Sequence, residues 1–94
     1  MALIVQKFGG TSVKDRSRIF NVARIVANTR NAGNEVVVVV SAQGDTTDDL
    51  IAKAAEITGN PSSREMDMLL ATGEQISISL LAMALQEIGV SPVS

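Results

Sequence analysis

Five consecutive valines, Val36 to Val40, are the feature that most restricts the fold of this chain. A run of β-branched residues without polar alternation favours a strand buried on both faces, as at the centre of a parallel sheet. A second apolar run, Ala2 to Phe8, also predicts a buried strand. Because parallel strands need a crossover connection, we expect a helix between the two runs.

Helical periodicity fills the segment between the two apolar runs. From about Val13 to Asn31, apolar residues recur at helical spacing, and the positions that form this stripe are Ile19, Val22, Ala23 and Val26. Gly33 then provides a C-terminal stop. A second helix is expected to follow Val40, with Thr46 or Thr47 as its N-cap.

A long helical stretch with a glycine inside it occupies the last third of the chain. Ser62 or Ser63 can cap its start, and Gly89 ends it. We expect a break or kink near Gly73, and we expect the methionines along the stretch to fill the core. The closing residues, Val90 to Ser94, resemble the beginning of another strand.

This order of elements predicts an α/β fold in which helices cover both faces of a parallel sheet, a three-layer αβα sandwich. Since the 94 residues end where a third strand would begin, we expect them to be the N-terminal piece of a larger domain. The longest apolar strand is too short to span a bilayer, and no basic segment precedes the N-terminal apolar residues. We therefore expect a cytoplasmic protein without a membrane partner.

Composition excludes several kinds of chemistry. The chain has no Cys and no His, so disulfides, thiolate zinc sites and a Ser-His relay are absent. Its formal charge is -2 and its basic residues are scattered, which argues against a nucleic-acid surface. Any reaction must therefore use lysine, carboxylates, hydroxyls or backbone amides.

Both predicted strands end in a polar, glycine-containing loop that precedes a helix. These loops are KFGGTS, residues 7–12, and SAQGDTT, residues 41–47. Neighbouring parallel strands would bring them to one edge of the sheet, where glycines and helix N-termini form an anion site. Lys7 precedes the glycines, unlike the lysine of a Walker A loop, and the three spaced glycines of a dinucleotide fingerprint are missing. These loops alone leave open an anion site or simple tight turns.

Three ordered blocks of the sequence resemble the aspartate kinases of the amino acid kinase family. The blocks are KFGGTSV at 7–13, VVVVVSAQGDTTDDL at 36–50 and REMDMLLATGEQISISLLAMAL at 64–85. The resemblance extends over all 94 residues and implies the carbamate kinase-like αβα fold. Gln43 departs from the pattern, because many relatives carry an apolar residue such as Met at this position.

The resemblance also implies roles for individual residues. Lys7 would contact the transferring phosphoryl group as the catalytic cation, and no residue is expected to bind a metal directly. The ATP phosphates would lie against Lys7, Phe8, Gly9, Gly10 and Thr11. The bound aspartate would contact Ser41 and Thr47, and Glu74, as a buried carboxylate, would hold its ammonium group.

The activity implied is phosphorylation of the side-chain carboxylate of L-aspartate by ATP and Mg²⁺, within lysine, threonine and methionine biosynthesis. Residues 1–94 would be the N-terminal part of the catalytic domain, with no regulatory domain in this chain. The full-length protein would form homo- or hetero-oligomers, and the fragment alone would lack essential groups. Two alternatives remain: an inactive α/β fragment that binds anions or a partner, and a kinase for another small acid of the superfamily.

Overall fold

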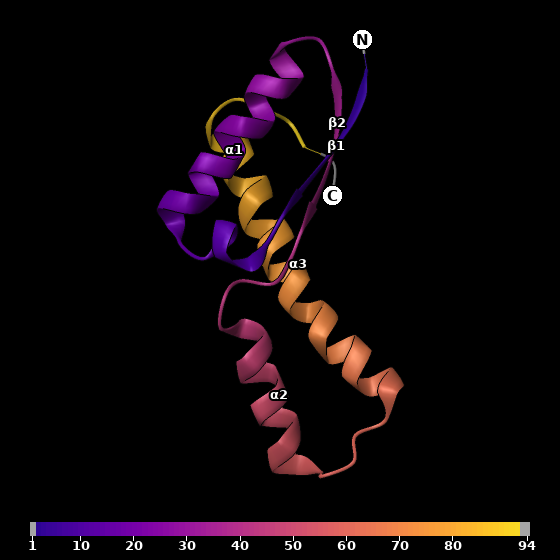
Figure 1. The fold of residues 1–94 in the computed structure, drawn as a ribbon. Coiled ribbons are helices and arrows are strands. Elements are labelled where there is room, and N and C mark those ends of the chain that lie inside the picture. The colour runs from indigo at the N-terminus through magenta and orange to yellow at the C-terminus, as the bar shows by residue number, and fades with distance from the viewer. Residues whose placement is uncertain (1, 93–94) are drawn as a thin grey trace.

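The computed structural model describes residues 2–92 and contains a two-stranded parallel sheet, a short 3₁₀ helix and three α-helices (Figure 1). In chain order the elements are β1 (Leu3–Phe8), η1 (Gly10–Val13), α1 (Arg16–Asn31), β2 (Glu35–Val40), α2 (Thr46–Ile57) and α3 (Ser63–Glu87). β1 and β2 pair in parallel with Lys7 opposite Val39 and Phe8 opposite Val40. The predicted parallel α/β architecture is confirmed.

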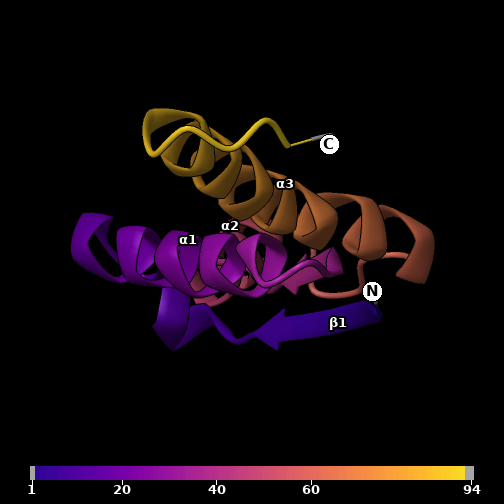
Figure 2. The ribbon, with the colours of Figure 1, turned by 90° about the horizontal axis from the view of Figure 1, so that it is seen from above.

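The sheet is covered on one face only within the described residues. Val36, Val38 and Val40 point toward the core, whereas Val37 and Val39 are 47% and 46% exposed. Figure 2 shows α1 and α3 on the same side of β1. The expectation that both faces of the valine run are buried is therefore wrong for residues 2–92, because these residues supply one helical layer.

The first helix begins three residues later than its periodicity suggests. Asp15 is the N-cap, and its Oδ1 accepts a hydrogen bond of 2.9 Å from the backbone N–H of Arg18. Val13 instead ends η1 and is fully buried in the core. The predicted apolar stripe of α1 is buried, and Gly33 follows the helix with a φ of 98°, which confirms its role as a stop.

The last helix is continuous, so the break expected near Gly73 is wrong. α3 runs for 25 residues through this position. A Cβ on Gly73 would lie 3.0 Å from the Cβ of Ala42 and 3.2 Å from Cγ2 of Thr46. The glycine therefore serves close packing between α3 and the segment after β2 rather than a bend.

The helix caps agree with the sequence in part. Oγ of Ser62 accepts a 3.3 Å hydrogen bond from the N–H of Glu65, as predicted. At α2 the N-cap position is Asp45, without a side-chain hydrogen bond, and Thr46 and Thr47 lie inside the first turn. The reason is a turn in which the N–H of Thr46 donates to the carbonyl of Gln43 at 2.9 Å, which starts the helix early.

Many apolar side chains of α2 and α3 are not buried within the described residues. α2 has no buried residue, and Met68 and Met83 are 59% and 62% exposed, so the expectation that they fill the core is wrong. α3 is the one described helix long and apolar enough to cross a bilayer by length and composition. It packs against α1 and α2 here, as core helices with such sequences also do.

Gly89 has a φ of 92° and ends the last helix as expected. The described residues after it, Val90 to Pro92, form no strand. The rest of the strand expected at the end of the chain, Val93 and Ser94, lies outside the described residues.

Candidate functional site

The parallel pairing brings the loops after β1 and β2 together at one edge of the sheet, as the sequence predicts. Their contact continues past the last strand pair, because the N–H of Ser41 donates a 3.0 Å hydrogen bond to the carbonyl of Phe8. The β1–α1 connection contains η1, and the β2–α2 connection leads directly into the first turn of α2. Backbone N–H groups from two segments therefore face the same region.

Glycine allows the two loops to touch. A Cβ at Gly10 would lie 2.5 Å from the carbonyl oxygen of Ala42 and 3.4 Å from the nitrogen of Gly44. On the other side of Gly44, the side chain of Lys14 runs past within van der Waals distance, with its Cγ 3.6 Å from where a Cβ would stand. The first loop thus packs on the second at positions where larger side chains would separate them.

A polar pocket of about 480 Å³ lies at this junction. Its lining residues come from both loops, the start of α2 and the middle of α3: Gly10, Thr11, Ser41, Ala42, Gly44, Thr47, Leu70 and Glu74. The structure therefore brings together predicted phosphate-loop residues and all three predicted substrate residues. Gly44 is the glycine of the second predicted loop, whereas the sequence assigns no role to Ala42 and Leu70, because their small or apolar side chains carry no chemical signal.

Glu74 reaches the pocket because α3 packs closely on the second loop at the preceding residue, Gly73. Its side chain is exposed in this structure, so the expected burial of this carboxylate is not found within residues 2–92. Thr47 is half-buried in the first turn of α2, where unpaired N–H groups and the helix dipole favour an anion. The pocket thus has a carboxylate on one wall and the N-terminus of a helix on another.

Three predicted residues do not line this pocket. Lys7 is exposed on the uncovered face of the sheet, and Phe8 points to the opposite face and packs against the core. Gly9 precedes η1, and its carbonyl accepts a 3.0 Å hydrogen bond from the N–H of Ser12. Lys7 lies near the end of β1, one residue before the strand end where the pocket begins, and its nucleotide contact stays a prediction.

Gln43 has a contact that sequence reasoning did not assign. Its Nε2 donates a 2.9 Å hydrogen bond to the carbonyl of Val13, thirty residues earlier in the chain. The sequence identified Gln43 as unusual, but only the fold shows what lies within its reach.

Metal binding by protein groups alone has no support in the described part of the chain. Residues 2–92 hold no group of three or more Asp, Glu, His or Cys side chains placed for a metal ion. Asp48 and Asp49 lie in the first turn of α2 and are exposed.

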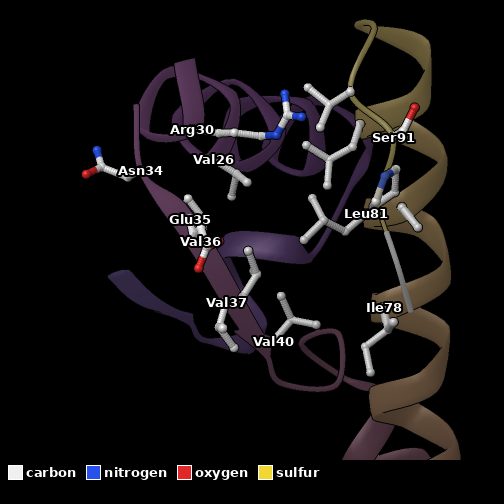
Figure 3. A pocket seen from close by; sticks show the side chains of 15 residues that line it. Val26, Arg30, Asn34, Glu35, Val36, Val37, Val40, Ile78, Leu81 and Ser91 are labelled. Carbon is white, nitrogen blue, oxygen red and sulfur yellow. The ribbon is translucent and has the colours of Figure 1, made fainter. Parts of the chain in front are cut away.

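A second cavity, of about 490 Å³, lies between β2 and the C-terminal half of α3 (Figure 3). It is lined mainly by aliphatic side chains, among them Val36, Val40, Ile78 and Leu81, with Arg30 at its upper rim in Figure 3. None of the predicted site residues lines it. Its chemistry is that of an incompletely filled core rather than of a polar ligand site.

Two strand-end loops and a helix N-terminus around a polar pocket are where parallel α/β proteins commonly hold anionic ligands, and this chain has that arrangement. The chain belongs to the amino acid kinase family, whose family model matches residues 2–94. Within this family, the chain is clearly similar to proteins named aspartokinase.

The chain is 61% identical over 94 residues to an aspartokinase of Bacillus sp. (strain MGA3) and 58% identical over 94 residues to aspartokinase 2 of Bacillus subtilis (strain 168). Both matches cover 100% of this chain and 23% of the relative. A crystal structure of aspartate kinase from Synechocystis superposes with a TM-score of 0.90 at 60% identity, over 93% of this chain and 15% of that chain. The chain thus spans about a quarter of the length of these curated relatives.

Proposed function

We propose that this chain is the N-terminal part of the catalytic domain of an aspartate kinase. The reaction would transfer the γ-phosphoryl group of ATP to the side-chain carboxylate of L-aspartate, giving 4-phospho-L-aspartate and ADP. The observation that carries the proposal is the pocket that unites Gly10, Ser41, Thr47 and Glu74 in a chain so similar to named aspartokinases.

The chemistry suits a site without histidine. The attacking carboxylate of aspartate is ionised at neutral pH, so no general base is needed. The protein must instead align two anions and reduce their mutual repulsion. When bound, Mg²⁺ would neutralise charge on the transferring phosphates.

The pocket divides these tasks between its walls. Gly10 and Thr11 belong to the first loop, whose backbone would lie against the phosphates. Ser41 and Thr47, from the second loop and α2, would donate hydrogen bonds to carboxylate oxygens of aspartate. Glu74 would accept from the α-ammonium group, a charge-assisted hydrogen bond that selects an amino acid over a simple dicarboxylate.

Lys7 would act on the phosphoryl group rather than on aspartate. It extends from β1 beside the first loop and does not line the pocket that contains Glu74. A lysine ammonium is a compact cation that can follow the charge of the transferring group. Further cationic groups and the adenine pocket would come from the polypeptide beyond residues 1–94.

The test is an assay for aspartyl phosphate trapped by hydroxylamine, made on the full-length polypeptide with Mg-ATP. L-aspartate should give the acyl hydroxamate, whereas L-glutamate and N-acetyl-L-glutamate should give little. Hydroxamate formed from either of the other acids but not from aspartate would move the proposal to another acid kinase of the family. A folded full-length polypeptide that phosphorylates none of them would favour the non-catalytic alternative.

A further inference from the structure

The two loops of the site are joined by one long-range side-chain hydrogen bond. Nε2 of Gln43, in the β2–α2 loop, donates to the carbonyl of Val13 at 2.9 Å, and Gln43 is half-buried. Val13 ends η1 and is fully buried among the residues of the core. The donor therefore lies in one loop, and the acceptor lies at the fixed end of the other.

Residues on each side of this bond form the pocket. Ala42 and Gly44 flank Gln43 and line the pocket, and Gly10 at the other end of η1 lines it as well. The backbone contacts of Gly10 and Ser41 hold the loops together at the strand ends. Gln43 adds an attachment at the far end of η1, so the loops are fixed at separate points rather than hinged about the strand ends.

From this geometry we infer that Gln43 is a positioning residue, which sets the distance between the phosphate-binding loop and the aspartate-binding loop. This inference rests on the proposed function for its kinetic consequence. The hydrogen bond touches neither the phosphates nor aspartate, because Gln43 does not line the pocket. Its loss should therefore leave each subsite intact and change only how well the two substrates are aligned.

Misalignment has a defined kinetic signature. A displacement of about 1 Å between reacting groups can cost on the order of 100-fold in rate even when both substrates still bind. We expect Gln43→Glu to lower kcat roughly 10- to 100-fold and to change the KM values for aspartate and ATP less than about threefold. A simple loss of folded protein would instead lower the amount of active enzyme and leave the kcat of the folded fraction unchanged.

The experiment compares the full-length polypeptide with its Gln43→Glu and Gln86→Glu variants. Glutamate matches the length of glutamine, but its ionised carboxylate is an acceptor only and cannot donate the hydrogen bond to Val13. Gln86 is exposed near the end of α3 and lines none of the cavities described here, so it is a matched control. Steady-state kinetics are measured for both substrates, with the concentration of folded enzyme determined separately.

Hydrogen exchange measured by mass spectrometry gives a second reading that does not depend on activity. In Gln43→Glu, the peptides that contain residues 9–14 and 41–47 should exchange faster, and the rest of the chain should be unchanged. Unchanged exchange in both loops, or faster exchange throughout, would overturn the inference. So would an unchanged kcat in a polypeptide that phosphorylates aspartate.

The two proposals fail separately. If the unsubstituted polypeptide phosphorylates no aspartate, the proposed function fails. The hydrogen-exchange comparison then still decides whether Gln43 fixes the two loops. If aspartate is phosphorylated and only the KM for one substrate changes in Gln43→Glu, Gln43 belongs to that subsite, and its role in spacing the loops is wrong.

Discussion

The Cα of Gly10 lies so close to the carbonyl oxygen of Ala42 that a Cβ on residue 10 would stand 2.5 Å from that oxygen. The obstacle is backbone, which cannot rotate away as a flexible side chain can. Gly9, the preceding residue, has no atom within 4 Å of the corresponding position. The two adjacent glycines therefore have different roles: the first borders open space, and the second permits contact between the loops.

This difference predicts a large effect on stability for one substitution and almost none for its neighbour. Gly10→Ala should force the loops apart and lower the free energy of unfolding by about 1–3 kcal/mol, as overpacking does elsewhere. Gly9→Ala should change it by less than about 0.5 kcal/mol, the range of most surface substitutions. Thermal unfolding of the full-length polypeptide measures both, and equal effects of the two variants would contradict the assigned contact.

Gly73→Ala tests the packing of α3 on the second loop. Alanine should gain about 1 kcal/mol of helix propensity, but its Cβ would lie 3.0 Å from that of Ala42. Since the Cβ of Ala42 moves only with its backbone, we expect a net loss of about 1 kcal/mol. The unfolding midpoint should fall, whereas Gly59→Ala, with no atom within 4 Å, should leave it unchanged or raise it slightly. A higher unfolding midpoint for Gly73→Ala would show that the loop containing Ala42 moves to accommodate the new Cβ.

Lys7→Ala should reduce kcat by about 100-fold or more, because a cation directed at developing charge contributes mainly to the transition state. The KM for aspartate should change little, and stability should be unaffected, since Lys7 is exposed. Lys53→Ala, an exposed lysine on α2, is the control for a general loss of positive charge. An unchanged kcat for Lys7→Ala would remove this residue from the catalytic assignment.

Glu74→Gln should mainly raise the KM for aspartate. Replacing an ionised acceptor by a neutral amide costs about 1.5–3 kcal/mol of charge-assisted hydrogen bonding, or roughly 10- to 150-fold in affinity. Glu56→Gln, an exposed carboxylate on α2 outside the pocket, should behave like the unsubstituted protein. A change in the KM for ATP alone would assign Glu74 to the nucleotide.

The sequence predicts the order of the elements and the meeting of the two loops for local reasons. Periodicity identifies α1, and parallel pairing follows from two unbroken apolar runs separated by one helix. The features that the sequence does not predict depend on contacts between residues far apart in the chain. Gly73 is a helix breaker by propensity, yet here its missing side chain accommodates Ala42, thirty-one positions away, and the helix continues.

Site residues show the same division. Gly10, Ser41, Thr47 and Glu74 are found from motifs, and the structure gathers them in one pocket. The hydrogen bond of Gln43 to Val13 has no local signal, because a glutamine in a polar loop usually faces water. The exposure of Val37 and Val39 also follows from which layers are present, not from the strand's own sequence.

Gly73 and Glu74 are successive residues of α3, so their directions differ by about 100° around the helix axis. If α3 turned by one residue in either direction, the side chain of Thr72 or of Glu74 would meet Ala42, where even a lone Cβ stands only 3.0 Å from the Cβ of Ala42. The contact at Gly73 therefore locks the rotational phase of the helix. The direction in which the Glu74 carboxylate points into the pocket is therefore set by the close packing of its neighbour Gly73.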